Sequence, residues 1–121
     1  MTELNSHLLD IATAELAPSP APARIVSGDP TCKEKVIVDT GSLEIGVWEV
    51  TPGVFDSVKH DIGEVVQFVS GAGRIEHPDG TVSPIAAGVV VEFLPGWTGT
   101  WYIEETTRKL YTIYKTAPAQ A

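Results

Sequence analysis

Short β-branched and aromatic runs, separated by Gly, Pro and Asp, make up the chain from Lys35 to Lys115. Runs of this length and composition are typical of antiparallel strands joined by tight turns. No helical periodicity lies between them, which excludes a parallel sheet with crossover helices. The pattern therefore predicts an all-β antiparallel sandwich or barrel. The expected strands cover residues 35–38, 43–50, 64–69, 73–77, 81–85, 89–93, 100–104 and 108–115.

The clearest turn in the sequence lies at His77–Gly80. Pro78 suits the start of a turn, and Gly80 accepts the positive φ that closes it. We therefore predict a hairpin that joins strand 73–77 to strand 81–85. His77 itself, beside the turn, is expected to be a surface histidine.

The N-terminal stretch follows a different pattern. Residues 2–16 place apolar side chains at helical spacing, which predicts a short amphipathic helix. The proline-rich stretch 18–23 cannot continue a helix and is expected to be an extended linker. A mobile N-terminal tail is the alternative. The chain is thus divided into an extension (1–34), a barrel (35–116) and a C-terminal tail (117–121). The apolar residues at helical spacing are Leu4, Leu8, Ile11, Ala12 and Leu16.

Composition narrows the expected partners and compartment. The chain has 121 residues, the size of one domain, and its 16 acidic and 8 basic side chains give a net charge of -8. This charge repels phosphate backbones and anionic lipid, so we expect neither nucleic acid nor a membrane as a partner. The single cysteine, Cys32, is expected in a polar loop. It cannot form an intramolecular disulfide, and we expect a cytoplasmic location.

Two glycine-framed segments carry a family resemblance. Segment 53–71 resembles the first cupin motif, in which a Gly precedes an H-x-H pair, a Glu, six further residues and a second Gly. Glu64 and Gly71 keep the last spacing of that motif. Segment 87–101 is similar to the second cupin motif, in which a Gly, a strand and a Pro-Gly turn precede a metal-binding His. Its proline stands one place late.

Two further sequence segments narrow the resemblance to one subfamily. Residues 46–53 (GVWEVTPG) and the sequence Arg108-Lys109-x-Tyr111 are similar to the small cupin subfamily that contains the ureidoglycine aminohydrolase cupin domain. The match spans about residues 40–116. It implies an RmlC-like jelly roll, an antiparallel double-stranded β-helix. Because small cupins commonly pair their barrels, we also expect a homodimer.

The resemblance implies a divalent metal, such as Mn, Fe, Zn or Ni, held by imidazole and carboxylate side chains. Its four ligand positions fall on Val58, His60, Glu64 and Gly99. Valine and glycine side chains donate no lone pair, whereas metal sites of this kind normally use three or more protein ligands. We therefore expect an incomplete metal site at His60 and Glu64.

The same resemblance implies that Tyr111 and Lys115 line a pocket. Strand alternation puts both on one face, roughly 13 Å apart. The alternative is that Tyr111 packs in the core and Lys115 caps the strand end in water. Trp48 and Trp101 are candidate ligand-binding residues, with core packing as their alternative role. Trp101 shares strand parity with position 99 and is expected to face the cavity.

These residues lead to two functional hypotheses. In the first, the barrel mouth binds a small organic molecule and catalyses a proton-transfer reaction of the isomerase, lyase or hydrolase type. Its catalytic residues would be Glu64 and His60, with Glu64 acting as base through a pKa raised by an apolar cavity. In the second, the barrel is a non-enzymatic small-molecule-binding or accessory interaction protein.

Overall fold

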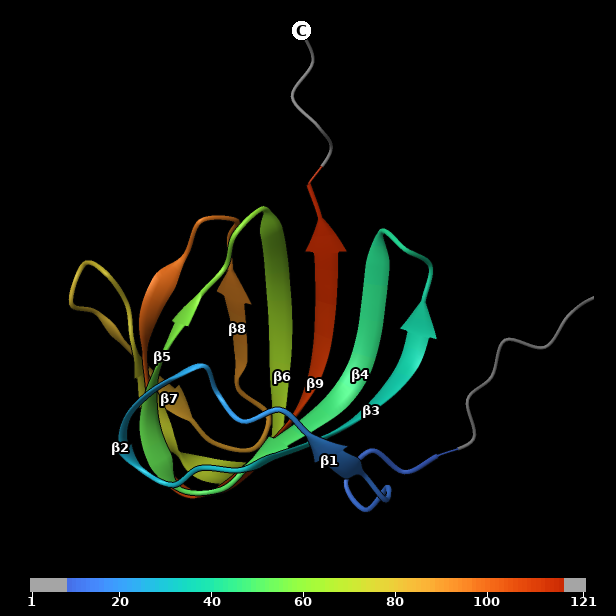
Figure 1. Cartoon of the computed structure of the whole chain (residues 1–121), viewed down its shortest axis with the longest axis horizontal. Coiled ribbons are helices and arrows are strands. Elements are labelled where there is room, and N and C mark those ends of the chain that lie inside the picture. Colours follow the sequence, from blue (N-terminus) through green and yellow to red (C-terminus); the bar gives the residue numbers. More distant parts are fainter. Residues whose placement is uncertain (1–8, 117–121) are drawn as a thin grey trace, which may run out of the picture.

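The computed structural model describes residues 9–116, which form one antiparallel sheet of nine strands curled around a common interior (Figure 1). Residues 9–116 form no helix, so they contain no helix able to cross a lipid bilayer. The predicted all-β antiparallel class is confirmed. The strands are β1 (Ala17–Ser19), β2 (Arg24–Gly28), β3 (Cys32–Asp39), β4 (Leu43–Val50), β5 (Gly53–Val58), β6 (Ile62–Glu76), β7 (Val82–Ile85), β8 (Val90–Phe93) and β9 (Thr98–Lys115).

Two long strands, β6 and β9, hold the sheet together. They pair with each other over most of their length. On its other edge β9 pairs with β5 through its first residues and with β4 through its last ones. The other edge of β6 pairs with β8 and then with β7. Because each long strand bends between its two sets of partners, the sheet closes on itself into a barrel-like jelly roll.

Each long strand replaces two short strands of the sequence prediction. Segments 64–69 and 73–77 fall within β6, apart from His77, and segments 100–104 and 108–115 fall within β9. The β6–β9 pairing shifts register between Phe68 and Gly73, as it does at β-bulges. The glycines in this stretch therefore bend the strand and do not end it.

Gly71 lies at this bend with φ of 121°, which L-residues with a Cβ rarely adopt. A Cβ at Gly71 would lie 2.6 Å from the Cα of Thr107, a fully buried residue of β9. The close approach of the two strands therefore requires glycine. This explains the second glycine of the first motif.

The predicted hairpin at His77–Gly80 is confirmed. The N–H of His77 donates to the carbonyl of Thr81, and the N–H of Gly80 donates to the carbonyl of His77. Gly80 has φ of 87°, the positive value expected of the residue that closes the turn. The expectation of a surface histidine is wrong, because the His77 ring is half-buried between Trp97 and Ser83.

The contacts of His77 also fix its chemistry. Trp97 Nε1 donates to His77 Nδ1 over 3.0 Å, so Nδ1 is an acceptor and the neutral ring carries its proton on Nε2. That nitrogen lies 2.7 Å from Ser83 Oγ and donates to it. A donor cannot remove the hydroxyl proton of Ser83. The cluster is therefore a structural clamp and not a nucleophile with its base.

The expected N-terminal helix is absent from its described part. Residues 9–16 contain only a turn at 11–13, and residues 2–8 lie outside the described residues. The segment is held by Arg108, which donates from Nη1 to the carbonyls of Ile11 and Ala14 at 3.0 and 2.9 Å. Part of the expected linker pairs with β3 as β1, and β2 pairs with β5. The sheet therefore begins at Ala17, and not at Lys35.

Candidate functional site

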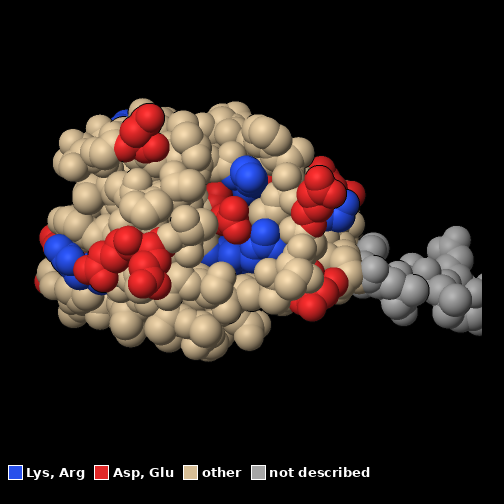
Figure 2. Space-filling view, turned by 90° about the horizontal axis from the view of Figure 1, so that it is seen from below, with Lys and Arg blue, Asp and Glu red and all other residues tan. Residues whose placement is uncertain are grey.

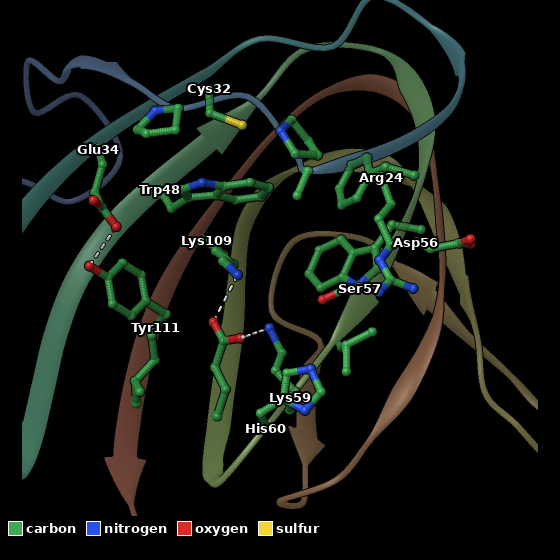
Figure 3. A pocket seen from close by; sticks show the side chains of 18 residues that line it. Arg24, Cys32, Glu34, Trp48, Asp56, Ser57, Lys59, His60, Lys109 and Tyr111 are labelled. Carbon is green, nitrogen blue, oxygen red and sulfur yellow. Dashed lines mark hydrogen bonds and ion pairs between the residues drawn. The ribbon is translucent and has the colours of Figure 1, made fainter.

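A cavity of about 440 Å³ opens inside the curled sheet. This volume lies in the usual range for sites that bind small molecules. One wall is aromatic, built by Trp48, Phe55 and Trp101, while charged side chains enter from β3, β6, β9 and the segment after β5 (Figure 3). Trp101 faces the cavity, as its strand parity predicts, and also packs between Phe55 and Phe93 in the core; Trp48 lines the cavity as well.

The most buried charged groups of the cavity form a triad of Lys59, Glu64 and Lys109. Glu64 is only 2% exposed. Its Oε2 accepts a hydrogen bond from Lys109 Nζ at 2.8 Å, and Lys59 Nζ lies 2.7 Å from its Oε1. Figure 3 shows both lysines reaching the one carboxylate from different elements. Opposed ammonium groups therefore share a single buried counter-charge.

Strand alternation explains how Lys109 enters the interior. Thr107, Lys109 and Tyr111 are buried alternate residues of β9, and the same side of that strand carries Trp101 and Ile103. The Lys109 ammonium lies 4.4 Å from the centre of the Trp48 ring and 4.9 Å from that of Trp101. Contacts of this kind stabilise a cation that has left water.

Opposing effects act on the pKa of the Glu64 carboxyl. Burial alone would raise it, but the ammonium groups of Lys109 and Lys59 outweigh burial and hold the pKa below its usual value. Glu64 is therefore ionised at neutral pH. The raised pKa predicted for Glu64 is wrong in direction, because the effect of the two lysines is larger than that of burial. Burial also lowers the pKa of Lys109, although Glu64 partly offsets this.

Tyr111 lines the cavity and is 1% exposed. Its hydroxyl oxygen lies 2.8 Å from Oε2 of both Glu34 and Glu44. Burial raises the pKa of the phenol, and the two carboxylates raise it further. Tyr111 is therefore a neutral donor whose one proton serves one carboxylate at a time.

Two further predicted site residues and the single cysteine lie in different surroundings. His60 is exposed but lines the cavity. Lys115 is exposed at the end of β9 and does not line the cavity, which agrees with the alternative that it caps the strand end in water. Cys32 begins β3 and is 4% exposed, which corrects the expected polar loop. Burial raises the pKa of its thiol to about 11, so it is protonated at neutral pH.

The residues present do not fit the metal centre that the resemblance implies. Both carboxylate oxygens of Glu64 already face ammonium groups, and Val58 offers no donor atom. A ligand side chain does not fit at Gly99, because its Cβ would meet the Trp97 ring and lie 2.5 Å from the carbonyl oxygen of Glu76. Across residues 9–116, no three His, Cys, Asp or Glu side chains gather where they could hold one ion.

Neither lysine of the triad was predicted from the sequence as a site residue. Lys109 stands in the phrase Arg108-Lys109-x-Tyr111, and its strand parity with Tyr111 was a signal that it points inward. Lys59 follows β5, a strand that the sequence analysis did not predict. Lysines are rarely buried unless paired, so residue type favoured exposure at both positions.

Acidic and basic side chains also lie near one another on the surface (Figure 2). Figure 2 shows basic side chains lying next to acidic ones near the centre of the face seen from below. On another part of the barrel, Arg108 Nε lies 3.2 Å from Glu49 Oε1, between β9 and β4. The triad differs from the Arg108–Glu49 pair in the deeper burial of its carboxylate and in its two cations per anion.

The curled antiparallel sheet, with a ligand-sized cavity between its strands, defines a cupin-type barrel protein. The chain belongs to the EutQ-like cupin domain family, whose model matches residues 38–111. This confirms the cupin resemblance, while the finer resemblance to the ureidoglycine aminohydrolase subfamily stays a prediction. A search of curated proteins found no match.

Solved structures share the fold of this chain. The chain is similar to a protein of unknown function from Pseudomonas syringae pv. tomato, with 30% identity and a TM-score of 0.74 over 84% of this chain and 45% of that one. It is also similar to the Clostridium difficile EutQ protein (18% identity, TM-score 0.63, 76% of this chain and 75% of that one). A third similar structure is a predicted oxalate decarboxylase from Thermotoga maritima (14% identity, TM-score 0.67, 84% of this chain and 95% of that one). The chain thus spans less than half of the Pseudomonas protein.

Proposed function

We propose that the barrel cavity binds a small organic molecule. The observation that carries this proposal is the combination of a cavity of about 440 Å³, an aromatic wall and a buried charged triad. Small-molecule sites typically join apolar walls to a few polar groups that fix orientation. In this cavity Trp48 and Trp101 supply the wall, and the triad supplies the polar groups.

Filling the cavity tests this function. We expect a chemically diverse set of small molecules to contain compounds that raise the melting temperature in a saturable way. Val58→Trp places an indole among the lining residues and abolishes binding of those compounds. Val82→Trp, at an exposed site on β7, is the matched control and leaves binding unchanged. Compounds that bind equally well to both variants would contradict a cavity site, as would a set without any saturable binder.

Proton transfer is the reaction class that the triad favours. An ionised carboxylate and a buried ammonium 2.8 Å apart can exchange a proton with a ligand placed beside them. Since the pKa of Glu64 is lowered, Lys109 is the better proton carrier and Glu64 orients it. A binding or accessory role without catalysis is the alternative.

Deuterium exchange separates these alternatives. A proton-transfer enzyme in D₂O places deuterium on a carbon of its bound ligand, which mass spectrometry detects. Exchange that is lost in Lys109→Met and kept in Lys115→Met supports catalysis. Bound compounds that gain no deuterium support a binding or accessory role.

The finer resemblance, to the ureidoglycine aminohydrolase cupin, does not supply a substrate. Of the two pocket residues carried over from it, Tyr111 lines the cavity and Lys115 does not. The implied metal ligands are also incomplete at Val58 and Gly99. We therefore propose the ligand class from the triad itself.

A further inference from the structure

The triad carries an excess of positive charge. Lys59 and Lys109 carry two positive charges, and Glu64 carries one negative charge. Their side chains are 13%, 8% and 2% exposed, so water screens them poorly. Buried charges are normally paired, because an unpaired one loses its hydration without compensation. The triad therefore has a net charge of one positive unit without a partner among its own three side chains.

Other acidic side chains of the cavity do not supply that partner. The Glu34 carboxylate accepts the hydroxyl of Tyr111. Asp56 accepts a hydrogen bond from Thr100 Oγ1, and Figure 3 shows its carboxylate turned away from the cavity. Arg24 adds another cation to the lining, and it forms no ion pair with a described residue. Among the described residues Glu64 is thus the one acidic side chain that forms an ion pair with either ammonium group, and a bound anion can supply the missing partner.

Hydrogen bonding leads to the same conclusion. Each ammonium has three N–H donors. In the described part of the chain Lys109 Nζ makes one hydrogen bond, to Glu64, and the only ion pair of Lys59 is also with Glu64. The contact of Lys59 with Glu64 Oε1 is an ion pair at 2.7 Å whose angles do not form a hydrogen bond, so the N–H groups of Lys59 remain available to an acceptor. The triad is thus charged, buried and short of hydrogen-bond partners.

We infer that the cavity takes an organic carboxylate whose two oxygens bridge Lys59 and Lys109. This deepens the proposed function and rests on it. Glu64 demonstrates the geometry, since its own two oxygens meet the two ammonium groups at 2.7 and 2.8 Å. A monoanion matches the single surplus charge, whereas phosphate would bring up to two. The rings of Trp48 and Trp101 suit a flat apolar body, so the ligand class is an aryl carboxylate.

Benzoate and benzamide test this inference, because they share shape and differ in charge. By calorimetry on the full chain, we expect benzoate to bind about tenfold to a hundredfold tighter than benzamide, the effect of a charge-assisted hydrogen bond. Lys59→Met should remove most of that preference. Lys59 is the informative position because its replacement leaves the buried Lys109–Glu64 pair intact. Lys115→Met, outside the cavity, is the control and should keep the preference.

The outcomes are distinguishable. Equal affinity for benzoate and benzamide, with no effect of Lys59→Met, overturns the carboxylate inference and leaves the proposed function standing. Tighter binding of inorganic phosphate than of benzoate also overturns it. If neither compound binds but others compete for the cavity, only the ligand class is wrong. If no compound of any class enters the cavity, both the inference and the proposed function fail.

Discussion

Glu64→Gln lowers the free energy of unfolding at neutral pH by about 3–5 kcal/mol, as expected when one partner of a buried ion pair is removed. Glutamine keeps the shape of the side chain but removes the negative charge that Lys59 and Lys109 share. Urea denaturation followed by tryptophan fluorescence measures the change. Glu92→Gln, at an exposed carboxylate of β8, is the control and shifts the value by less than about 0.5 kcal/mol.

The pH dependence follows from the same carboxylate. Its folded-state pKa lies below the usual value of 4.5, so its stabilising effect is complete above the unfolded-state pKa. That effect is lost as the pH falls through the folded-state value. Parent protein should lose stability in acid below about pH 4.5, and Glu64→Gln should show a flatter profile there. A variant as stable as the parent at neutral pH would contradict the role given to the triad.

Gly71→Ala should also destabilise the fold strongly, by about 2–5 kcal/mol. Alanine must adopt φ of 121°, and its Cβ must displace Thr107 at the centre of the β6–β9 pairing. Gly80→Ala isolates the backbone contribution, since Gly80 has φ of 87° but open space around it. We expect about 1 kcal/mol at that position, from the φ requirement alone.

Chemical denaturation of the two alanine variants gives the comparison. A larger loss at Gly71 than at Gly80 supports close strand approach as the reason for the motif glycine. Equal losses would mean that Thr107 moves aside easily, and the bend in β6 would then need another explanation.

Alternation and turn residues were enough to predict the fold class and much of the sheet. Strand 43–50 matches β4 to the residue, and the hairpin at His77–Gly80 forms as predicted. Strands β1 and β2 escaped prediction because β1 contains Pro18, prolines lie near both ends of β2, and both strands lie mostly exposed at the edges of the strand order. The glycines at 71 and 73 looked like strand ends because local sequence does not show a bulge.

The candidate site was predictable only where a local rule applied. Motif spacing found Glu64, and strand parity placed Trp101 in the cavity. Lys109 lies 45 residues from Glu64 and meets it only through the β6–β9 pairing, which is a property of the whole sheet. Its burial also opposes the usual preference of lysine for water. Lys115 shares the strand parity of Tyr111 but lies in water, because parity does not tell where a strand leaves the barrel.

The most direct test of the central claim uses the three indole N–H groups of the chain as reporters in ¹⁵N NMR. Trp48 and Trp101 line the cavity, whereas Trp97 lies outside its lining and donates to His77. On titration with compounds that raise the melting temperature, we predict saturable shifts of the Trp48 and Trp101 signals while the Trp97 signal stays in place. Shifts confined to Trp97, or no shift with any such compound, would contradict a ligand site in the cavity.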